Sequence, residues 1–239
     1  IGMLDDLSQE EIKTNQTALE RLDALTANTI SFAYSDRVHP IQNVSFELNK
    51  GGSLAIVGIS GSGKSTMVDL ITGLRMPTKG QIEYNGVDLR QVNREGLRNK
   101  IGIATEVEII EGSILENIQL NNTDISMHEI NAALAAFNLV EDFAKLEHGL
   151  DTVLTGFGAP LSITQLQRLM LVRAIVTNPE LLIIDGIIDN LSTEQTSTVI
   201  HYLNKRKDDW MLLLTTRSKE LASHFDQQLV LSDLMGRTK

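Results

Sequence analysis

The nine residues GISGSGKST, at positions 58–66, constrain this chain more than any other feature. They follow the apolar run SLAIV and precede MVDLITGL, which has helical spacing. The pattern G-x-x-x-x-G-K-[ST] between a strand and a helix is typical of a phosphate-binding loop. Glycines let successive backbone N–H groups point inward, and the helix adds the positive end of its dipole. An ordinary glycine-rich turn is the alternative, and four fixed residues in this context argue against it.

This loop predicts a site for a nucleotide and a magnesium ion. Lys64 is expected to reach the β- and γ-phosphates, and the Ser65 hydroxyl to ligate Mg²⁺. The run LLII then carries Asp185 to the end of a second strand, where it can hold the magnesium ion through water. The loop residues predicted to bind the nucleotide are Gly58, Ser60, Gly61, Ser62, Gly63, Lys64, Ser65 and Thr66.

Composition restricts the class of protein and the kind of partner. The 239 residues include 21 basic and 31 acidic side chains, and the net charge of −10 argues against a nucleic-acid partner, which needs a basic surface. The absence of cysteine excludes disulfides, thiolate catalysis and thiolate metal sites. No apolar run approaches the ~20 residues that span a bilayer, so the chain as given is expected to be soluble.

Hydrophobic periodicity predicts a polar, amphipathic lead-in over residues 3–28, then strands, helices and strands again. The middle of the chain, about 107–178, is helix-rich. One long helical period covers SMHEINAALAAFNLVEDFAKL, and a second helix covers LSITQLQRLMLVRAIVTN and ends before Pro179. The expected strands are TISFAY, VSFELN, SLAIVG, GQIEYNGVDL with a turn at Asn85–Gly86, ELLIID, WMLLLTT and QQLVLSD. This order predicts an α/β nucleotide-binding core interrupted by a helical insertion.

From about Asn28 onward the chain resembles the ATP-binding domain of ABC transporters, and it is most similar to the exporter branch. The segments that carry the resemblance are FAY, NVSFELNKGG, GISGSGKST, GSILENI, EHGLDT, LSITQLQRLMLVRA, ELLIID and DNLS. The resemblance implies an α/β fold, a P-loop NTPase (RecA-like) core with an antiparallel β subdomain and a helical insertion subdomain. It also implies ATP and Mg²⁺ as ligands, and an aromatic ring, here Tyr34, that stacks on adenine.

The same resemblance implies a domain organisation and partners. Residues 1–27 would link the domain to a membrane domain that the chain does not include, and residues 28–239 would form the ATP-binding domain, with the helical subdomain at about 107–178. The family's domains pair head to tail at the cytoplasmic face of a membrane. The expected partners are therefore a transmembrane domain and a second ATP-binding domain, identical or different.

The signature motif, which in this family is usually L-S-G-G-Q, departs from the pattern. Here Ser162 and Gln165 are retained, and they are expected to contact the nucleotide of the partner domain. Ile163 and Thr164 replace the two glycines. Glycine lets the backbone approach a phosphate closely, so the branched side chains are expected to hinder the contact across the dimer.

Other departures affect the groups that act on the γ-phosphate. Gly186 stands where the family has its glutamate general base, and Ser192 where it has a loop aspartate. In this family a histidine after a late buried strand, the switch histidine, contacts the γ-phosphate. Here Arg217, or Thr216 in a shifted alignment, takes its place. The glutamine that senses magnesium is replaced by Thr105 or Glu106, and Glu106 offers a carboxylate as a further magnesium ligand.

Three hypotheses follow. In the first, the domain binds MgATP and associates with a partner, but hydrolysis is weak or lost, because loss of a positioned base costs about 10²–10⁴ in rate. In the second, the domain is an active exporter ATPase in which Asp189, Glu106 or the substrate phosphate positions the water. In the third, it is a soluble ABC-type ATPase that serves no transporter. The charge and the segment EHGLDT argue against this third hypothesis.

Overall fold

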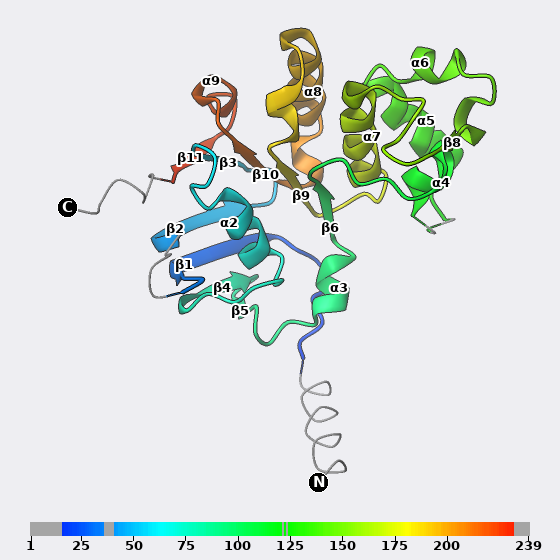
Figure 1. Ribbon diagram of the computed structural model, residues 1–239. Helices are drawn as coiled ribbons and strands as arrows, with labels where there is room; N and C mark the ends of the chain where they lie inside the picture. The colour runs from blue at the N-terminus through cyan, green and yellow to red at the C-terminus, as the bar shows by residue number, and fades with distance from the viewer. Residues whose placement is uncertain (1–15, 36–40, 121, 123, 232–239) are drawn as a thin grey trace.

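The computed structural model describes residues 16–35, 41–120, 122 and 124–231 (Figure 1). It contains a parallel sheet, an antiparallel sheet and a group of helices on one side of the parallel sheet. The predicted α/β fold, a P-loop NTPase core with an antiparallel β subdomain and a helical insertion, is confirmed. None of the helices in the described residues has the length and apolar content needed to cross a membrane.

The parallel sheet has the strand order β11-β3-β10-β9-β6. Its three central strands, β3, β10 and β9, are short apolar runs, as expected for strands that are covered on both faces. Alternate residues of β3 enter two different cores: Leu54 and Ile56 pack towards the antiparallel sheet, and Ala55 and Val57 pack towards the helices. The strands are β3 (Ser53–Val57), β6 (Ile101–Ala104), β9 (Leu181–Asp185), β10 (Met211–Thr216) and β11 (Gln227–Val230).

Helix α2 (Lys64–Ile71) packs between the parallel sheet and the antiparallel sheet (Figure 1). The strand order of the antiparallel sheet is β2-β1-β4-β5. The predicted turn at Asn85–Gly86 joins β4 to β5, and both residues have positive φ angles, 52° and 78°, as a tight hairpin turn requires. The strands are β1 (Ala24–Phe32), β2 (Ile41–Asn49), β4 (Lys79–Tyr84) and β5 (Val87–Asp88).

The folded domain begins earlier than the sequence indicates. Strand β1 starts at Ala24, four residues before the predicted boundary at Asn28. Leu22 and Leu25 are fully buried, so this part of the predicted linker belongs to the core. The spacing of apolar residues predicts an amphipathic lead-in, whereas Leu22 and Leu25 belong to the core beneath the antiparallel sheet. Residues 1–15 of the predicted linker lie outside the described residues.

The helical subdomain replaces one predicted helix by two. Helix α5 (Met127–Ala136) ends before Asn138, which adopts a left-handed φ of 53°, and α6 (Val140–Ala144) follows. A left-handed residue cannot continue a helix, and asparagine tolerates this conformation better than most residues. The subdomain also contains α4 (Ile114–Gln119), α7 (Ile163–Ile175) and two short paired strands, β7 (Gly112–Ser113) and β8 (Val153–Leu154).

The remaining elements connect the sheet strands. Helix α3 (Arg94–Arg98) leads into β6, and the 3-10 helices η1 (Gly149–Asp151) and η3 (Lys207–Asp209) lead into β8 and β10. After β9 the chain forms the 3-10 helix η2 (Ile187–Asn190) and then α8 (Thr193–Lys205). Helix α9 (Lys219–Ala222) joins β10 to β11. The elements η2, α8 and α9 surround the carboxyl ends of β9 and β10, where the site described below lies.

Glu180, at the start of β9, connects the N-terminal segment to the sheet. Its carboxylate accepts hydrogen bonds from Leu22 N–H and from Lys100 Nζ, the latter at 2.8 Å. Burial by itself raises the pKa of Glu180, but these hydrogen bonds and the charge of Lys100 outweigh burial and hold the pKa below its ordinary value. A lowered pKa means that the native state favours the carboxylate. The interaction therefore stabilises the fold above the unfolded-state pKa and is lost as pH falls through the native-state pKa.

Replacing Glu180 by Gln is expected to lower the free energy of unfolding at pH 7 by about 1 kcal/mol, since charge-assisted hydrogen bonds become neutral ones. The difference from wild type should shrink as pH falls through the lowered native-state pKa of Glu180, where the wild-type carboxylate becomes protonated. Urea unfolding at several pH values measures both effects. Glu141→Gln, an exposed change on α6, serves as the control. Equal loss of stability for Glu180→Gln at all pH values would contradict the electrostatic assignment.

Candidate nucleotide-binding site

The loop between β3 and α2 has the geometry of a phosphate cradle. Gly61 and Gly63 have φ angles of 79° and 97°, which favour glycine. A Cβ on Gly58 would lie 2.2 Å from Ser62 Oγ, so only glycine fits this close turn. No side chain caps the first turn of α2, so its N–H groups are available to an anion.

Lys64 lies across this loop. Its Nζ donates to the carbonyl oxygens of Gly58 and Ile59, at 2.7 and 2.8 Å. Partial burial lowers the pKa of Lys64 and Arg217 lowers it further, whereas Asp185 and Asp189 act in the opposite direction. The ammonium group is thus held at the loop by carbonyl groups that compensate its loss of water. A phosphate would supply a stronger, charged partner.

A cavity of about 730 Å³ opens beside the loop. It collects residues from the phosphate loop, from the end of β9, from the segment after β6 and from the end of β10. The predicted site residues that line it are Ser60, Lys64, Ser65, Glu106, Asp185, Gly186 and Arg217. Gln167 of α7, which sequence reasoning missed, also lines it, and the buried Oε1 of this side chain has no hydrogen-bond partner among the described residues.

Asp185 and Ser65 fit the expected magnesium ion. One carboxylate oxygen of Asp185, Oδ1, accepts a hydrogen bond from the Thr215 hydroxyl, which orients the group. Ser65 is exposed in the same cavity. Both offer hard oxygen donors, and Mg²⁺ typically takes one or two protein oxygens and completes its shell with phosphate and water. Bound there, the ion would neutralise charge on the phosphates.

Glu106 and Thr105 differ in their position. Glu106 lines the 730 Å³ cavity together with Lys64, whereas Thr105 lines only an adjoining cavity of about 470 Å³, which also contains Ser65 and Asp185. Glu106 is thus the better placed of the two candidates for the family's glutamine position, and it adds a negative charge beside the cradle.

Gly186, at the position expected for a general base, adopts a left-handed conformation with a φ of 69°. No heavy atom lies within 4 Å of the position that a Cβ would take, so the site has room for a side chain. The backbone, and not the space, therefore favours glycine here. The turn leads directly into η2, whose Asp189 N–H donates to the Gly186 carbonyl at 3.2 Å.

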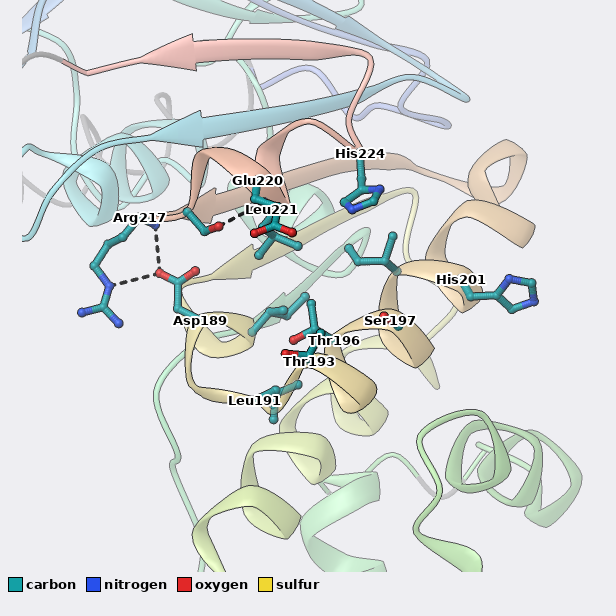
Figure 2. A pocket seen from close by; sticks show the side chains of 13 residues that line it. Asp189, Leu191, Thr193, Thr196, Ser197, His201, Arg217, Glu220, Leu221 and His224 are labelled. Atoms are coloured by element: carbon teal, nitrogen blue, oxygen red, sulfur yellow. Dashed lines mark hydrogen bonds and ion pairs between the residues drawn. The ribbon is translucent and has the colours of Figure 1, made fainter.

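The two candidates for the switch position have different surroundings. Thr216 is fully buried, and its hydroxyl donates to Asp189 Oδ1. Arg217 is exposed, and both its backbone N–H and its Nε donate to Asp189 Oδ2, at 2.9 and 3.2 Å. Figure 2 shows these two contacts. Only Arg217 reaches the cavity, so it is the residue available to a nucleotide.

A second pocket of about 760 Å³ lies between α8 and α9, and Figure 2 shows Asp189 and Arg217 at one end of it. The same two residues line the nucleotide cavity. Sequence reasoning named Asp189 as a possible water-positioning group but did not foresee its ion pair with Arg217. Only the fold brings η2 and the end of β10 together.

Tyr34 does not line the 730 Å³ cavity beside the phosphate loop. Its ring is half exposed, and its hydroxyl lies 2.8 Å from Thr66 Oγ1. The ring packs edge-on against Phe32, and the guanidinium group of Arg75 lies 4.9 Å from its centroid. The contact between Arg75 and Tyr34 could not be predicted from the sequence, because no local pattern around Arg75 indicates an aromatic partner.

The two retained signature residues also lie apart from the cavity lining. Ser162 caps α7, and Gln165 completes a capping box by accepting a hydrogen bond from the Ser162 N–H at 2.8 Å. Ile163, which replaces a glycine, is 61% exposed and lines the cavity. A capping box satisfies N–H groups at the start of the helix. The first turn of α7 is therefore ordered without any ligand.

Comparison with known proteins agrees with this geometry. The sequence profile of the ABC transporter family matches residues 41–188. An ATP-dependent lipid A-core flippase of Pasteurella multocida (strain Pm70) is 32% identical over 87% of this chain and 36% of the flippase. The β-(1→2)glucan export ATP-binding/permease protein NdvA of Rhizobium meliloti (strain 1021) is 35% identical over 83% of this chain and 35% of that protein.

A solved structure of a bacterial Atm1-family ABC exporter with ATP bound is also similar. It superposes with a TM-score of 0.85 and 27% identity over 91% of this chain and 38% of that chain. The present chain spans about a third of the length of these two curated relatives. It belongs to the ABC transporter family, and the part that it covers is an ATP-binding domain.

Replacing Gly186 by Glu is expected to lower the free energy of unfolding by about 1 kcal/mol, because a side chain disfavours the left-handed backbone. Gly186→Asn should cost clearly less, since asparagine tolerates this conformation. Chemical denaturation of the three proteins measures the difference. Equal stability of the Glu variant and wild type would contradict the left-handed turn.

Proposed function

We propose that this chain is the ATP-binding domain of an ABC exporter, that it holds MgATP and dimerises with a second ATP-binding domain, and that its hydrolysis is weak or lost. The groups that bind phosphate are intact: the glycine loop, Lys64, Ser65 and Asp185 share one cavity or line its edge. The groups that act on the γ-phosphate have changed.

One observation carries the proposal on hydrolysis. Among the described residues of the turn that follows Asp185, no carboxylate is free to accept a proton from water. Gly186 has no side chain, and both oxygens of Asp189 already accept hydrogen bonds from Thr216 and Arg217. A general base must lie within hydrogen-bond reach of the attacking water. Binding can therefore persist while the chemical step is slow.

The proposal on transport rests on the relatives. Their names describe a lipid A-core flippase, a glucan export protein and a leukotoxin export protein. This supports the transport hypothesis over a domain that serves no transporter. The whole protein would then include a transmembrane domain, with this domain at the cytoplasmic face and the residues before β1, which starts at Ala24, as the connection.

The proposal on dimerisation rests on the start of α7. Ser162 and Gln165 do not line the 730 Å³ cavity of their own chain, although Ile163 and Gln167 of the same helix do, so these two side chains would serve a partner's nucleotide. The branched side chains of Ile163 and Thr164 at the same helix start would weaken this contact. Tyr34, half exposed, would offer its ring to adenine.

The test is to measure ATP affinity and turnover on the same preparation. We expect MgATP binding with turnover at least about 100-fold below the ~10 s⁻¹ of a median enzyme. Lys64→Ala should weaken binding by about tenfold or more, because a charge-assisted contact to phosphate is lost. Lys79→Ala, an exposed lysine on the antiparallel sheet, serves as the control.

Two outcomes would overturn this proposal. Brisk turnover that disappears in Lys64→Ala would show that the domain is an active ATPase. Failure of the wild-type chain to retain MgATP at millimolar concentration, with an intact fold by circular dichroism, would show that the cradle does not bind it.

Glu106 supports a second candidate, an active exporter ATPase with a rewired site. It is an exposed carboxylate in the same cavity as Ser65 and Asp185. If Glu106 positions the water, Glu106→Gln should lower turnover by about 10²-fold or more while ATP affinity is kept or rises. Glu111→Gln, an exposed change outside the cavity, serves as the control. An unchanged rate in Glu106→Gln would exclude this candidate.

A further inference from the structure

Asp189 and Arg217 form an ion pair whose two members differ in freedom. The Asp189 side chain is 6% exposed and is fixed by Thr216, whereas the Arg217 side chain is 58% exposed. Asp189 Oδ2 also accepts a hydrogen bond from the Arg217 backbone N–H, and this bond does not depend on the guanidinium group. The carboxylate is thus held by other contacts, whereas the guanidinium group is exposed to solvent.

The pair lies where a triphosphate would extend. Both residues line the 730 Å³ cavity that also contains Lys64, Ser65 and Asp185. Asp185, Asp189, Arg217 and Lys64 therefore bring two negative and two positive charges to the lining of one cavity. The terminal phosphate of a nucleotide in the cradle would therefore meet both an attractive guanidinium group and a repulsive carboxylate.

We infer that Asp189 holds Arg217 in the empty site, and that the γ-phosphate of ATP competes for Arg217 and draws it away from Asp189. This inference rests on the proposed function, since it requires ATP in the cavity. A mostly exposed arginine gains little from a single surface-type contact with a carboxylate. Its planar group binds phosphate through paired, charge-assisted hydrogen bonds, which are stronger.

The consequence is discrimination between ATP and ADP. ADP lacks the γ-phosphate, so it would leave the Asp189–Arg217 pair intact and gain nothing from Arg217. ATP would gain the arginine contact minus the cost of breaking the pair. In this assignment Arg217 is a specificity-determining residue for the terminal phosphate, and Asp189 is a positioning residue that sets how easily Arg217 is released.

The test compares affinities for ATP, a non-hydrolysable ATP analogue and ADP, all with Mg²⁺, by calorimetry on the 239-residue chain. Wild type should prefer ATP and the analogue to ADP. Arg217→Ala should reduce this preference by about tenfold through loss of ATP affinity, with ADP affinity unchanged. Arg90→Ala is the matched control, because Arg90 forms an ion pair of similar exposure with Asp88 far from the site, and it should keep the preference. An undiminished preference in Arg217→Ala overturns the inference.

Asp189→Asn separates competition from simple repulsion. It should raise ATP affinity about threefold in the wild-type background. In the Arg217→Ala background this gain should be clearly smaller, because no arginine remains to be released and only the repulsion by the carboxylate is removed. An equal gain in both backgrounds means that Asp189 only repels the phosphate, and the competition is then wrong. Absence of binding by either nucleotide in wild type overturns the proposed function as well, whereas binding without discrimination overturns only this inference.

Discussion

Strand β10 pairs in parallel with β3 on one side and with β9 on the other, and the site depends on this arrangement. The register places Thr216 opposite Val57 and Thr215 opposite Asp185. Because the carboxyl ends of all three strands meet at one edge, the glycine loop after β3, Asp185 and Arg217 come together there. Their apolar interiors are covered on both faces, which holds the edge in place.

β10 also fixes the two acidic groups of the site. Consecutive hydroxyl groups at its end, Thr215 and Thr216, donate to Asp185 and Asp189. The left-handed turn at Gly186 returns the chain through η2 so that Asp189 meets β10 again. The left-handed turn at Gly186 and the Asp189–Arg217 pair are therefore parts of one local conformation.

The helical subdomain has a core that is continuous with one face of the parallel sheet. It presents Ser162 and Gln165 at the start of α7, in a capping box that needs no ligand. Phosphate binding and the signature are thus built on separate elements.

The sequence by itself determined the cradle, the strands and the family, because these depend on short contiguous patterns: glycine spacing, apolar runs and the lysine and serine that end the motif. It misplaced the start of β1 and the break between α5 and α6, since the spacing of apolar residues does not say what covers them or where a left-handed Asn138 ends a helix. Only the tertiary structure decided which acid meets which base. Asp189 and Arg217 are 28 positions apart, and their contact exists because two neighbouring parallel strands end at the same edge of the sheet.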